Sequence, residues 1–384
     1  MIQNLQRIFS KRAFYSIALI FSVNALLFTF WITRIPEVKE RLAIGEGTLG
    51  LVLFCMPIGA LIAMLMTNHL TQRFGAGRVT IAATIVFACC MLLPLHMPNI
   101  YLLGLSLFVV GISTGIMDIA MNAVSATLEA QHKQIIMSTC HGFFSLGGMI
   151  GAGIGSLMLG WEVDANLQML VGVLFCLALT VFVLSKEVLP VKEENAAEEG
   201  GGWAFPTRAI LGLVVISFCT MQGEGVIADW SAIFMEEVAQ ADDFLIALGY
   251  FGFSMSMTLG RFYGDSIIEQ AGPRKVVWTS GAIVVLGLLL VLPAFPWLSI
   301  LGFTLAGAGY ALLVPVLFSE AAKTPGISPS KGIASVASFG YFGFLIGPTI
   351  IGGIAEWFNL QSSFTYLVVL TALAIFVGGR KIRV

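Results

Sequence analysis

A series of long apolar segments constrains this chain more than any other feature. Twelve stretches of about 20 residues carry few charges, and an α-helix of that length spans the hydrocarbon core of a bilayer. Only 11% of the residues are charged, whereas soluble domains average about 25%. The sequence therefore predicts an all-α integral membrane protein with twelve transmembrane helices. The predicted limits are 13–34, 48–70, 79–97, 100–124, 134–160, 165–185, 208–235, 243–264, 275–293, 297–319, 331–355 and 359–379.

The composition also argues against several classes of partner and site. A net charge of −2 gives no reason to expect nucleic acid as a partner. The N-terminal cluster Arg7, Lys11 and Arg12 precedes an apolar segment that is too long for a signal peptide, so we expect a retained first span. All six cysteines lie in apolar segments, where they are expected to act as small buried hydrophobes: Cys55, Cys89, Cys90, Cys140, Cys176 and Cys219.

One long polar stretch divides the apolar series. It runs over 186–202, where it carries a glutamate-rich run, and it ends in three consecutive glycines. This composition is typical of a flexible, solvated linker. We predict an N-terminal six-helix bundle over 1–185, a cytoplasmic linker over 186–207 and a C-terminal six-helix bundle over 208–384.

The distribution of lysine and arginine predicts the orientation. If the N-terminus is cytoplasmic, the cytoplasmic segments hold 17 of the 20 basic residues, and only Arg34, Lys39 and Arg41 fall outside. This asymmetry satisfies the positive-inside rule and predicts that both termini are cytoplasmic. The 17 residues are Arg7, Lys11, Arg12, Arg73, Arg78, Lys133, Lys186, Lys192, Arg208, Arg261, Arg274, Lys275, Lys323, Lys331, Arg380, Lys381 and Arg383.

The two halves repeat one another. Motifs recur at offsets of 196 to 199 residues: Trp31–Glu37 with Trp230–Glu236, Gly147–Gly151 with Gly343–Gly347, and the turn Arg73–Arg78 with Glu269–Lys275. Two six-helix repeats related by an axis along the membrane normal are typical of alternating-access transporters. In these proteins the solute binds near the bilayer midplane, between the halves.

Several motifs resemble a known family over most of the chain. The loop Asn68–Arg78 is similar to the basic loop between helices 2 and 3 of the major facilitator superfamily, although Gln72 stands where Asp is usual and Asn68 where Gly is usual. The acidic residue appears instead in the second half, as Asp265 in the motif that begins at Gly260-Arg261. We expect Arg73, Arg78, Arg261, Asp265 and Arg274 to lie in the inner loops.

A narrower resemblance concerns four motifs: Trp31-x-x-Arg34-x-Pro36, Asp118-x-x-x-Asn122, His141-Gly-x-x-Ser-Leu-Gly-Gly and Glu224-Gly-x-x-x-Asp229-Trp230. These resemble the YbjJ/MosC-like subgroup. The resemblance implies a small-solute permease in which helices 1, 4, 7 and 10 line a central cavity. Sugars, polyols and related polar metabolites are the usual solutes expected of the subgroup.

The stretch from Gly111 to Asn122 places a carboxylate inside a predicted span. Gly111, Gly115, Asp118 and Asn122 are spaced 4, 3 and 4 apart, so they share one face of a helix. A carboxylate at membrane depth is costly unless it faces a partner or a water-filled cavity. Asp118 is therefore a candidate for proton coupling or solute binding, with a buried structural hydrogen bond as the alternative.

His141 is expected at a depth similar to that of Asp118, on the next helix in the chain. A carboxylate and an imidazole that face each other can exchange a proton at physiological pH, so we expect His141 and Asn122 to shape the surroundings of Asp118. The alternative is that His141 only forms a hydrogen bond with a neighbouring helix.

Glu224 is the second candidate carboxylate, and Gly223 and Gly225 on either side let a solute or a backbone approach it. It can carry a proton or accept hydrogen bonds from solute hydroxyls. The alternative is a structural clamp to helix 1 through Asn24 or Thr29.

The outer ends of helices 1 and 7 carry opposite charges. Arg34 and Asp229 each lie next to a tryptophan, Trp31 or Trp230, at interface level. A pair between them would form an outer gate. The alternative is that each is a solvated charge at a helix end.

The glycine-rich runs of the predicted helices 5 and 11 are interpreted as close helix contacts. The sequence contains no nucleotide-binding loop, no paired His/Cys metal motif and no catalytic Ser/His/Asp order, so we expect neither an enzyme nor a cofactor.

We therefore expect a secondary active transporter that works by alternating access as a monomer in the inner membrane of a bacterial-type cell. Its partners are a small polar solute such as a sugar or polyol, a proton and the lipid bilayer, and the expected mode is symport. A proton-coupled multidrug or metabolite exporter, facilitated diffusion and a transport-silent membrane sensor remain as alternatives. The sensor requires a soluble signalling segment, which the predicted linker and tails do not offer.

Overall fold

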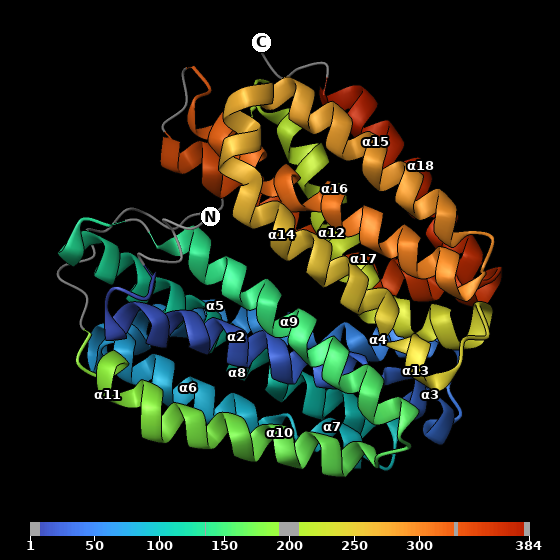
Figure 1. The fold of residues 1–384 in the computed structure, drawn as a ribbon, viewed down its shortest axis with the longest axis horizontal. Coiled ribbons are helices and arrows are strands. Elements are labelled where there is room, and N and C mark those ends of the chain that lie inside the picture. The colour runs from blue at the N-terminus through green and yellow to red at the C-terminus, as the bar shows by residue number, and fades with distance from the viewer. Residues whose placement is uncertain (1–7, 135, 192–206, 326–328, 380–384) are drawn as a thin grey trace. The chain divides into compact units, whose positions relative to one another are not determined.

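The structure, a computed structural model, describes residues 8–134, 136–191, 207–325 and 329–379. These residues are folded almost entirely into helices (Figure 1). Twelve helical spans in this part of the chain are long and apolar enough to cross a membrane, as predicted. They are Arg12–Leu42, Glu46–Ala63, Ala76–His96, Ile100–Glu129, Thr139–Gly160, Ala165–Phe182, Leu211–Val238, Asp243–Gly264, Pro273–Val291, Pro296–Ala321, Ser335–Trp357 and Leu360–Gly379.

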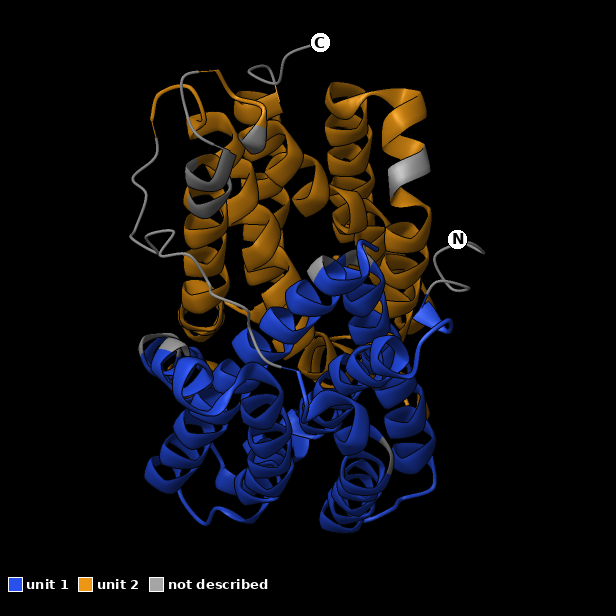
Figure 2. Cartoon of the chain, turned by 90° about the vertical axis from the view of Figure 1, so that its left-hand side faces the viewer, with its two compact units in different colours: residues 1–44, 52–199 blue, residues 45–51, 200–384 orange. Residues whose placement is uncertain are grey.

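The chain forms two compact units, coloured separately in Figure 2. Unit 1 comprises Met1–Ile44 and Val52–Glu199. Its helices are α2 (Arg12–Ile32), α3 (Ile35–Leu42), α5 (Cys55–Phe74), α6 (Ala76–Cys90), α7 (Leu93–His96), α8 (Ile100–His132), α9 (Met137–Gly160), α10 (Ala165–Leu179), the π-helix η1 (Thr180–Leu184) and α11 (Ser185–Val188).

Unit 2 comprises Gly45–Leu51 and Gly200–Val384. Its helices are α12 (Leu211–Ile233), the π-helix η2 (Phe234–Val238), α13 (Asp243–Ile246), α14 (Leu248–Ala271), α15 (Pro273–Val291), α16 (Pro296–Ala322), α17 (Pro329–Trp357) and α18 (Leu360–Gly379). Most of α4 (Glu46–Leu53) also belongs to unit 2, although it precedes the predicted division at residue 185. The reason is local, because the backbone N–H of Gly47 donates to a carboxylate oxygen of Glu356 at 3.1 Å.

The two units use the same pattern of helix packing. In unit 1, α2 packs on α9, and α5 and α6 both pack on α8. In unit 2, α12 packs on α17, and α14 and α15 both pack on α16 (Figure 1). These pairs correspond one to one along the chain, which agrees with the sequence repeat.

Glycines allow the closest of these contacts. A methyl carbon placed on Gly147 would lie 2.3 Å from the carbonyl oxygen of Ser22 on α2, and one placed on Gly343 would lie 2.3 Å from that of Phe218 on α12. Any larger residue must separate the two helices. The interpretation of both glycine runs as close helix contacts is confirmed at these positions.

Two equivalent turns also require glycine. Gly75 joins α5 to α6 with φ of 89°, and Gly272 joins α14 to α15 with φ of 79°. Residues with a Cβ rarely adopt this region of φ. The turn motif that repeats in the sequence is therefore a repeated backbone conformation.

The start of the predicted linker differs from the prediction. Residues 192–206 lie outside the described part of the chain, but Ser185–Val188 forms α11, and Val188 and Val191 are buried. The N–H of Gly77 donates to the carbonyl oxygen of Val191 at 3.1 Å. These two valines bury apolar surface against α6, so the chain is packed on unit 1 as far as Val191.

Candidate functional site

An ion pair inside unit 2 is the central feature of the candidate site. Glu224 lies in the middle of α12, and Nη2 of Arg261 on α14 lies 3.4 Å from its Oε2 atom. The two side chains are only 18% and 21% exposed. A buried charge is retained in a membrane-spanning helix when it has a partner, and here each residue supplies the charge that the other requires.

The position of Arg261 corrects the prediction that it lies in an inner loop. The helix α14 continues to Ala271, ten residues beyond Arg261. At about 1.5 Å per residue, this places Arg261 roughly 15 Å from the end of the helix. The basic residue that the motif assigns to a loop lies instead within a helix, as the counter-charge of Glu224.

The carboxylate of Glu224 is only half satisfied. Its Oε1 atom is buried and has no hydrogen-bond partner in the described structure, although a carboxylate oxygen can accept two hydrogen bonds. A buried acceptor without a donor is costly. The Oε1 atom is thus the position where a proton or a solute hydroxyl would add most to the interactions of this site.

Aromatic side chains lie close to α12 at the two glycines that flank Glu224. A methyl carbon on Gly223 would lie 2.0 Å from the hydroxyl of Tyr310, and one on Gly225 would lie 2.9 Å from the ring of Phe344. The glycines therefore admit side chains of α16 and α17 to α12. The clamp to helix 1 through Asn24 or Thr29 stays a prediction; within unit 1, Asn24 donates to Thr114 at 3.1 Å and Thr29 donates to the Ala25 carbonyl at 2.8 Å.

Further polar groups surround the ion pair. Tyr250 on α14 lies near Ser254 and close enough to Glu224, Asp229 and Arg261 to interact with their charges. Asp229 follows Glu224 on α12, is only partly exposed and has no ion-pair partner within the described part of unit 2. Tyr250 and Asp229 thus add a phenol and a second carboxylate to the ion pair and the Tyr310 hydroxyl.

Gln222 extends the polar surface to the other side of α12. Its side chain is completely buried, and its Oε1 atom accepts a hydrogen bond from the hydroxyl of Tyr366 at 3.3 Å. Its Nε2 atom has no partner within the residues described. Unit 2 thus carries a buried amide donor two residues before the half-satisfied carboxylate.

The carboxylate of unit 1 has a different environment. Asp118 lies on α8, and Asn122 one turn later donates to its backbone carbonyl at 2.8 Å and to its Oδ1 atom at 3.3 Å. The predicted shared face therefore brings these two side chains together. No counter-charge of the kind that Arg261 provides for Glu224 lies within ion-pairing distance of Asp118 in the part of unit 1 that is described.

His141 contacts α2, the helix on which α9 chiefly packs. Its exposed ring lies edge-on to Phe21 of α2, with 5.2 Å between the ring centroids. The reason is that α9 packs chiefly on α2, through its glycine face, and only slightly on α8. The proton exchange between His141 and Asp118 stays a prediction.

Arg34 is buried rather than solvated. Its Nε and Nη2 atoms donate to Oε1 of Gln168 at 2.9 and 2.6 Å, and Nη2 also reaches the carbonyl oxygen of Val163 at 2.7 Å. Its Nη1 atom pairs with Glu37 at 3.0 Å. This network fixes the end of α2 to the segment around α10, within unit 1. The gate between Arg34 and Asp229 stays a prediction.

The two tryptophans of the proposed gate are core residues. Trp31 and Trp230 are 1% and 0% exposed, and the indole N–H of each has no hydrogen-bond partner in the described structure. They occupy equivalent positions near the ends of α2 and α12. Both indoles are therefore packed inside their units, and the outer gate that includes them stays a prediction.

The remaining predicted loop residues flank the two glycine turns. Arg73 lies in the last turn of α5, Arg78 near the start of α6 and Arg274 at the start of α15. The side chain of Asp265 lies outside the described part of the structure. The sequence analysis missed Gln168, Tyr250 and Tyr366, since their roles depend on contacts between distant segments.

Comparison with known proteins places this architecture in a family. The sequence profile described as Major Facilitator Superfamily matches residues 17–319. The chain belongs to the major facilitator superfamily. Within this superfamily, it is 32% identical to the membrane protein MosC of Rhizobium meliloti over 361 residues, which cover 93% of this chain and 87% of MosC. The predicted resemblance to a MosC-like group is confirmed.

Solved structures of major facilitator transporters share the fold at low sequence identity. A nucleoside transporter, NupG, superposes with a TM-score of 0.79 and 13% identity over 97% of this chain and all of NupG. The fucose:proton symporter FucP of E. coli superposes with a TM-score of 0.60 and 16% identity over 97% of this chain and all of FucP. The chain is thus a multi-pass membrane protein with a transporter fold, which implies a small-molecule substrate.

Proposed function

We propose that this protein is a proton-coupled secondary active transporter of a small polar solute, such as a sugar, polyol or related metabolite. The observation that carries the proposal is the Glu224–Arg261 pair, in which one carboxylate oxygen is buried and lacks a partner. A charge pair left incomplete inside a membrane-spanning bundle is typical of a site completed by a proton or a bound solute.

The chemistry of the pair suggests how coupling works. While Glu224 is ionised, it attracts Arg261 and the pair is closed. A proton on Glu224 removes this attraction, so the guanidinium becomes available to donate to solute oxygens. Arg261 presents up to five N–H donors and the protonated carboxyl presents one O–H donor. Proton and solute then favour the same state of the site, which is the requirement for symport.

Asp118 and Asn122 provide a second polar position, in unit 1. The amide of Asn122 binds Oδ1 of Asp118, and this leaves the second carboxylate oxygen for a solute hydroxyl or a proton. We propose that this carboxylate contributes to solute binding, while Glu224 carries the coupling proton.

The type of solute is supported by fold neighbours and by the donors and acceptors at the site. FucP is a fucose:proton symporter and NupG a nucleoside transporter, and both solutes are polar molecules with several hydroxyl groups. Carboxylate, guanidinium, amide and phenol groups are suited to such solutes, since each forms directed hydrogen bonds. We propose a monomer in the bacterial inner membrane with both termini cytoplasmic, from the distribution of basic residues.

Net uptake into proteoliposomes that contain no solute tests the proposal. Purified protein is reconstituted with a pH-sensitive dye inside, and labelled sugars, polyols and amino sugars are offered in turn. We expect uptake of one class together with acidification of the lumen, and loss of the acidification in Glu224→Gln. Uptake without any pH change would contradict proton coupling. The absence of uptake across the panel would contradict the solute class and favour an exporter of larger apolar compounds.

A further inference from the structure

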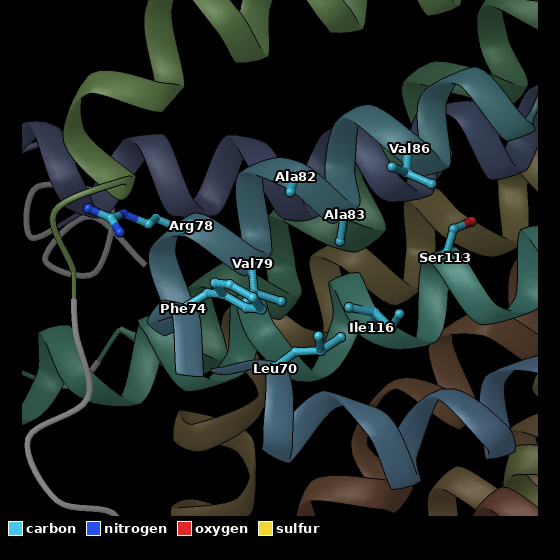
Figure 3. Close-up of a pocket in the computed structure, with 9 residues that line it drawn as sticks. All are labelled: Leu70, Phe74, Arg78, Val79, Ala82, Ala83, Val86, Ser113 and Ile116. Atoms are coloured by element: carbon cyan, nitrogen blue, oxygen red, sulfur yellow. The ribbon is translucent and has the colours of Figure 1, made fainter. Parts of the chain in front are cut away.

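A groove on unit 1 lies apart from the polar site. It has a volume of about 440 Å³ and is lined by α5, α6 and α8. Both α5 and α6 pack closely on α8 and contact each other much less, so the groove lies between them with α8 as its floor. The lining residues are Leu70, Phe74, Arg78, Val79, Ala82, Ala83, Val86, Ser113 and Ile116 (Figure 3).

The groove is open along its length and apolar inside. Phe74 is 47% and Val86 52% exposed, and both lie on helices that span the membrane. Ser113, the single hydroxyl in the lining, already donates to the carbonyl oxygen of Val110 at 2.8 Å. A polar solute would gain no hydrogen bonds here, whereas a hydrocarbon chain would bury apolar surface on three helices.

The length of the groove matches one leaflet. It follows α6 from Arg78 to Val86, eight residues, or about 12 Å of helix. Half of a hydrocarbon core that is about 30 Å thick is about 15 Å. The groove therefore accommodates the depth of one acyl chain that enters from a single membrane surface.

One end of the groove is positively charged. Arg78 lies at that end, with its guanidinium directed away from the apolar side chains (Figure 3). Arg73 lies close by, with its guanidinium carbon 5.3 Å from the ring centroid of Phe74, a lining residue. Both arginines are exposed, and neither forms an ion pair with Glu187 of the adjoining α11 or with any other described carboxylate.

The sequence around the arginine end of the groove contains no acidic residue. From Gly47 to Met117 the chain has no aspartate or glutamate, and Gln72 stands beside Arg73 where the superfamily loop usually has an aspartate. The equivalent turn of unit 2 differs, since Glu269 accompanies Arg274 and Lys275 there. The unit 1 turn therefore offers two cations at the level where the polar part of a lipid would lie.

We propose that this groove is a binding site for an anionic phospholipid. One acyl chain lies in the groove on α8, and the headgroup phosphate is bound by Arg73 and Arg78. Arginine binds phosphate oxygens through paired N–H groups, which gives an anionic headgroup an advantage over a zwitterionic one. The lipid fills the gap between α5 and α6.

Native mass spectrometry of the full-length protein tests the site. The protein is released from detergent after equilibration with equal amounts of phosphatidylglycerol and phosphatidylcholine. We expect one phosphatidylglycerol to remain bound, with a preference of about thirtyfold, because each basic side chain near an anionic headgroup contributes a factor of about five. The readout is lipid retention, so it does not depend on solute transport.

Matched variants distinguish binding of the lipid headgroup from binding of the acyl chain. Arg73→Gln with Arg78→Gln is expected to remove the preference, and Arg274→Gln, at the equivalent turn of unit 2, is expected to keep it. Ala82→Phe fills the groove and should lower retention of both lipids, unlike Ala282→Phe on the exposed face of α15. An unchanged preference in the double arginine variant, or an equal loss in Arg274→Gln, would overturn the proposal.

Discussion

The described part of each unit holds one guanidinium that is largely shielded from solvent, and the two differ in how completely their surroundings are bonded. Arg34 in unit 1 donates to Gln168, to the Val163 carbonyl and to Glu37, all at 3.0 Å or less. Arg261 in unit 2 pairs at 3.4 Å with Glu224, whose second carboxylate oxygen has no described partner. A compact, well-bonded network stabilises one arrangement of the chain, whereas a longer, half-satisfied pair can respond to a ligand. We therefore propose a structural role for Arg34 and a role in transport for Glu224 and Arg261.

The largest expected effect concerns Glu224. In Glu224→Gln we expect solute accumulation driven by a pH gradient to fall to background, because the amide cannot take up a proton. Solute exchange without a gradient should be largely retained, because the neutral amide resembles the protonated carboxyl of the solute-binding state. Uptake by proteoliposomes measures both. Glu237→Gln, at an exposed glutamate near the end of the same membrane span, is the control and should behave like the wild type.

A large loss of stability is expected at Arg34. Arg34→Met leaves Gln168 and the Val163 carbonyl without their donor, which should lower the free energy of unfolding by about 3–5 kcal/mol. Unfolding in mixed micelles measures this loss, and Arg41→Gln, at an exposed arginine, should lose less. Protein that remains folded should still couple solute to protons. Normal stability with lost transport would favour the outer gate between Arg34 and Asp229.

Intermediate effects are expected where the two units are alike. Gly147→Ala and Gly343→Ala place a methyl carbon 2.3 Å from a backbone oxygen, and each should lower the free energy of unfolding by about 1–3 kcal/mol. Gly353→Ala is the matched control on α17, since it has no atom within 4 Å of the added carbon. Equal stability of all three variants in the same micelle assay would show that these glycines do not set the helix spacing.

The smallest expected effect is at Asn122. Asn122→Ala removes a 3.3 Å hydrogen bond to Oδ1 of Asp118, worth about 0.5–1.5 kcal/mol. We expect a few-fold weaker solute affinity with coupling retained, seen as a higher half-saturating concentration in counterflow. Loss of lumen acidification in this variant would indicate that the coupling proton binds at Asp118 in unit 1 rather than at Glu224 in unit 2.

The sequence predicted the spans and the repeat because both depend on local patterns. Apolar runs of about 20 residues and glycines at fixed offsets are visible without knowledge of contacts. The turns at Gly75 and Gly272 illustrate this, since one motif at an offset of 197 residues gives one backbone conformation twice. Asn122 beside Asp118 is similarly a consequence of helical spacing alone.

The partners of the candidate residues were not predictable in the same way. The pairing of His141 with Asp118 stays a prediction, and the packing of α9 chiefly on α2, through its glycine face, could not be derived from chain order. Arg261 was assigned to a loop because its motif resembles one, although α14 continues past it. Its pairing with Glu224, 37 residues away, depends on how two helices are rotated, which hydrophobic periodicity does not define closely enough.

The most direct test of the account is a double-mutant cycle on the ion pair with two readouts. Glu224→Gln, Arg261→Gln and the double variant are compared for melting temperature and for proton-coupled solute uptake. Each single variant leaves a buried charge without its partner, so we expect both to melt at a lower temperature, and the double variant to recover stability. The account predicts that the double variant still fails to acidify the lumen. Recovery of both stability and proton-coupled uptake in the double variant would show that the pair is structural and would contradict its role in transport.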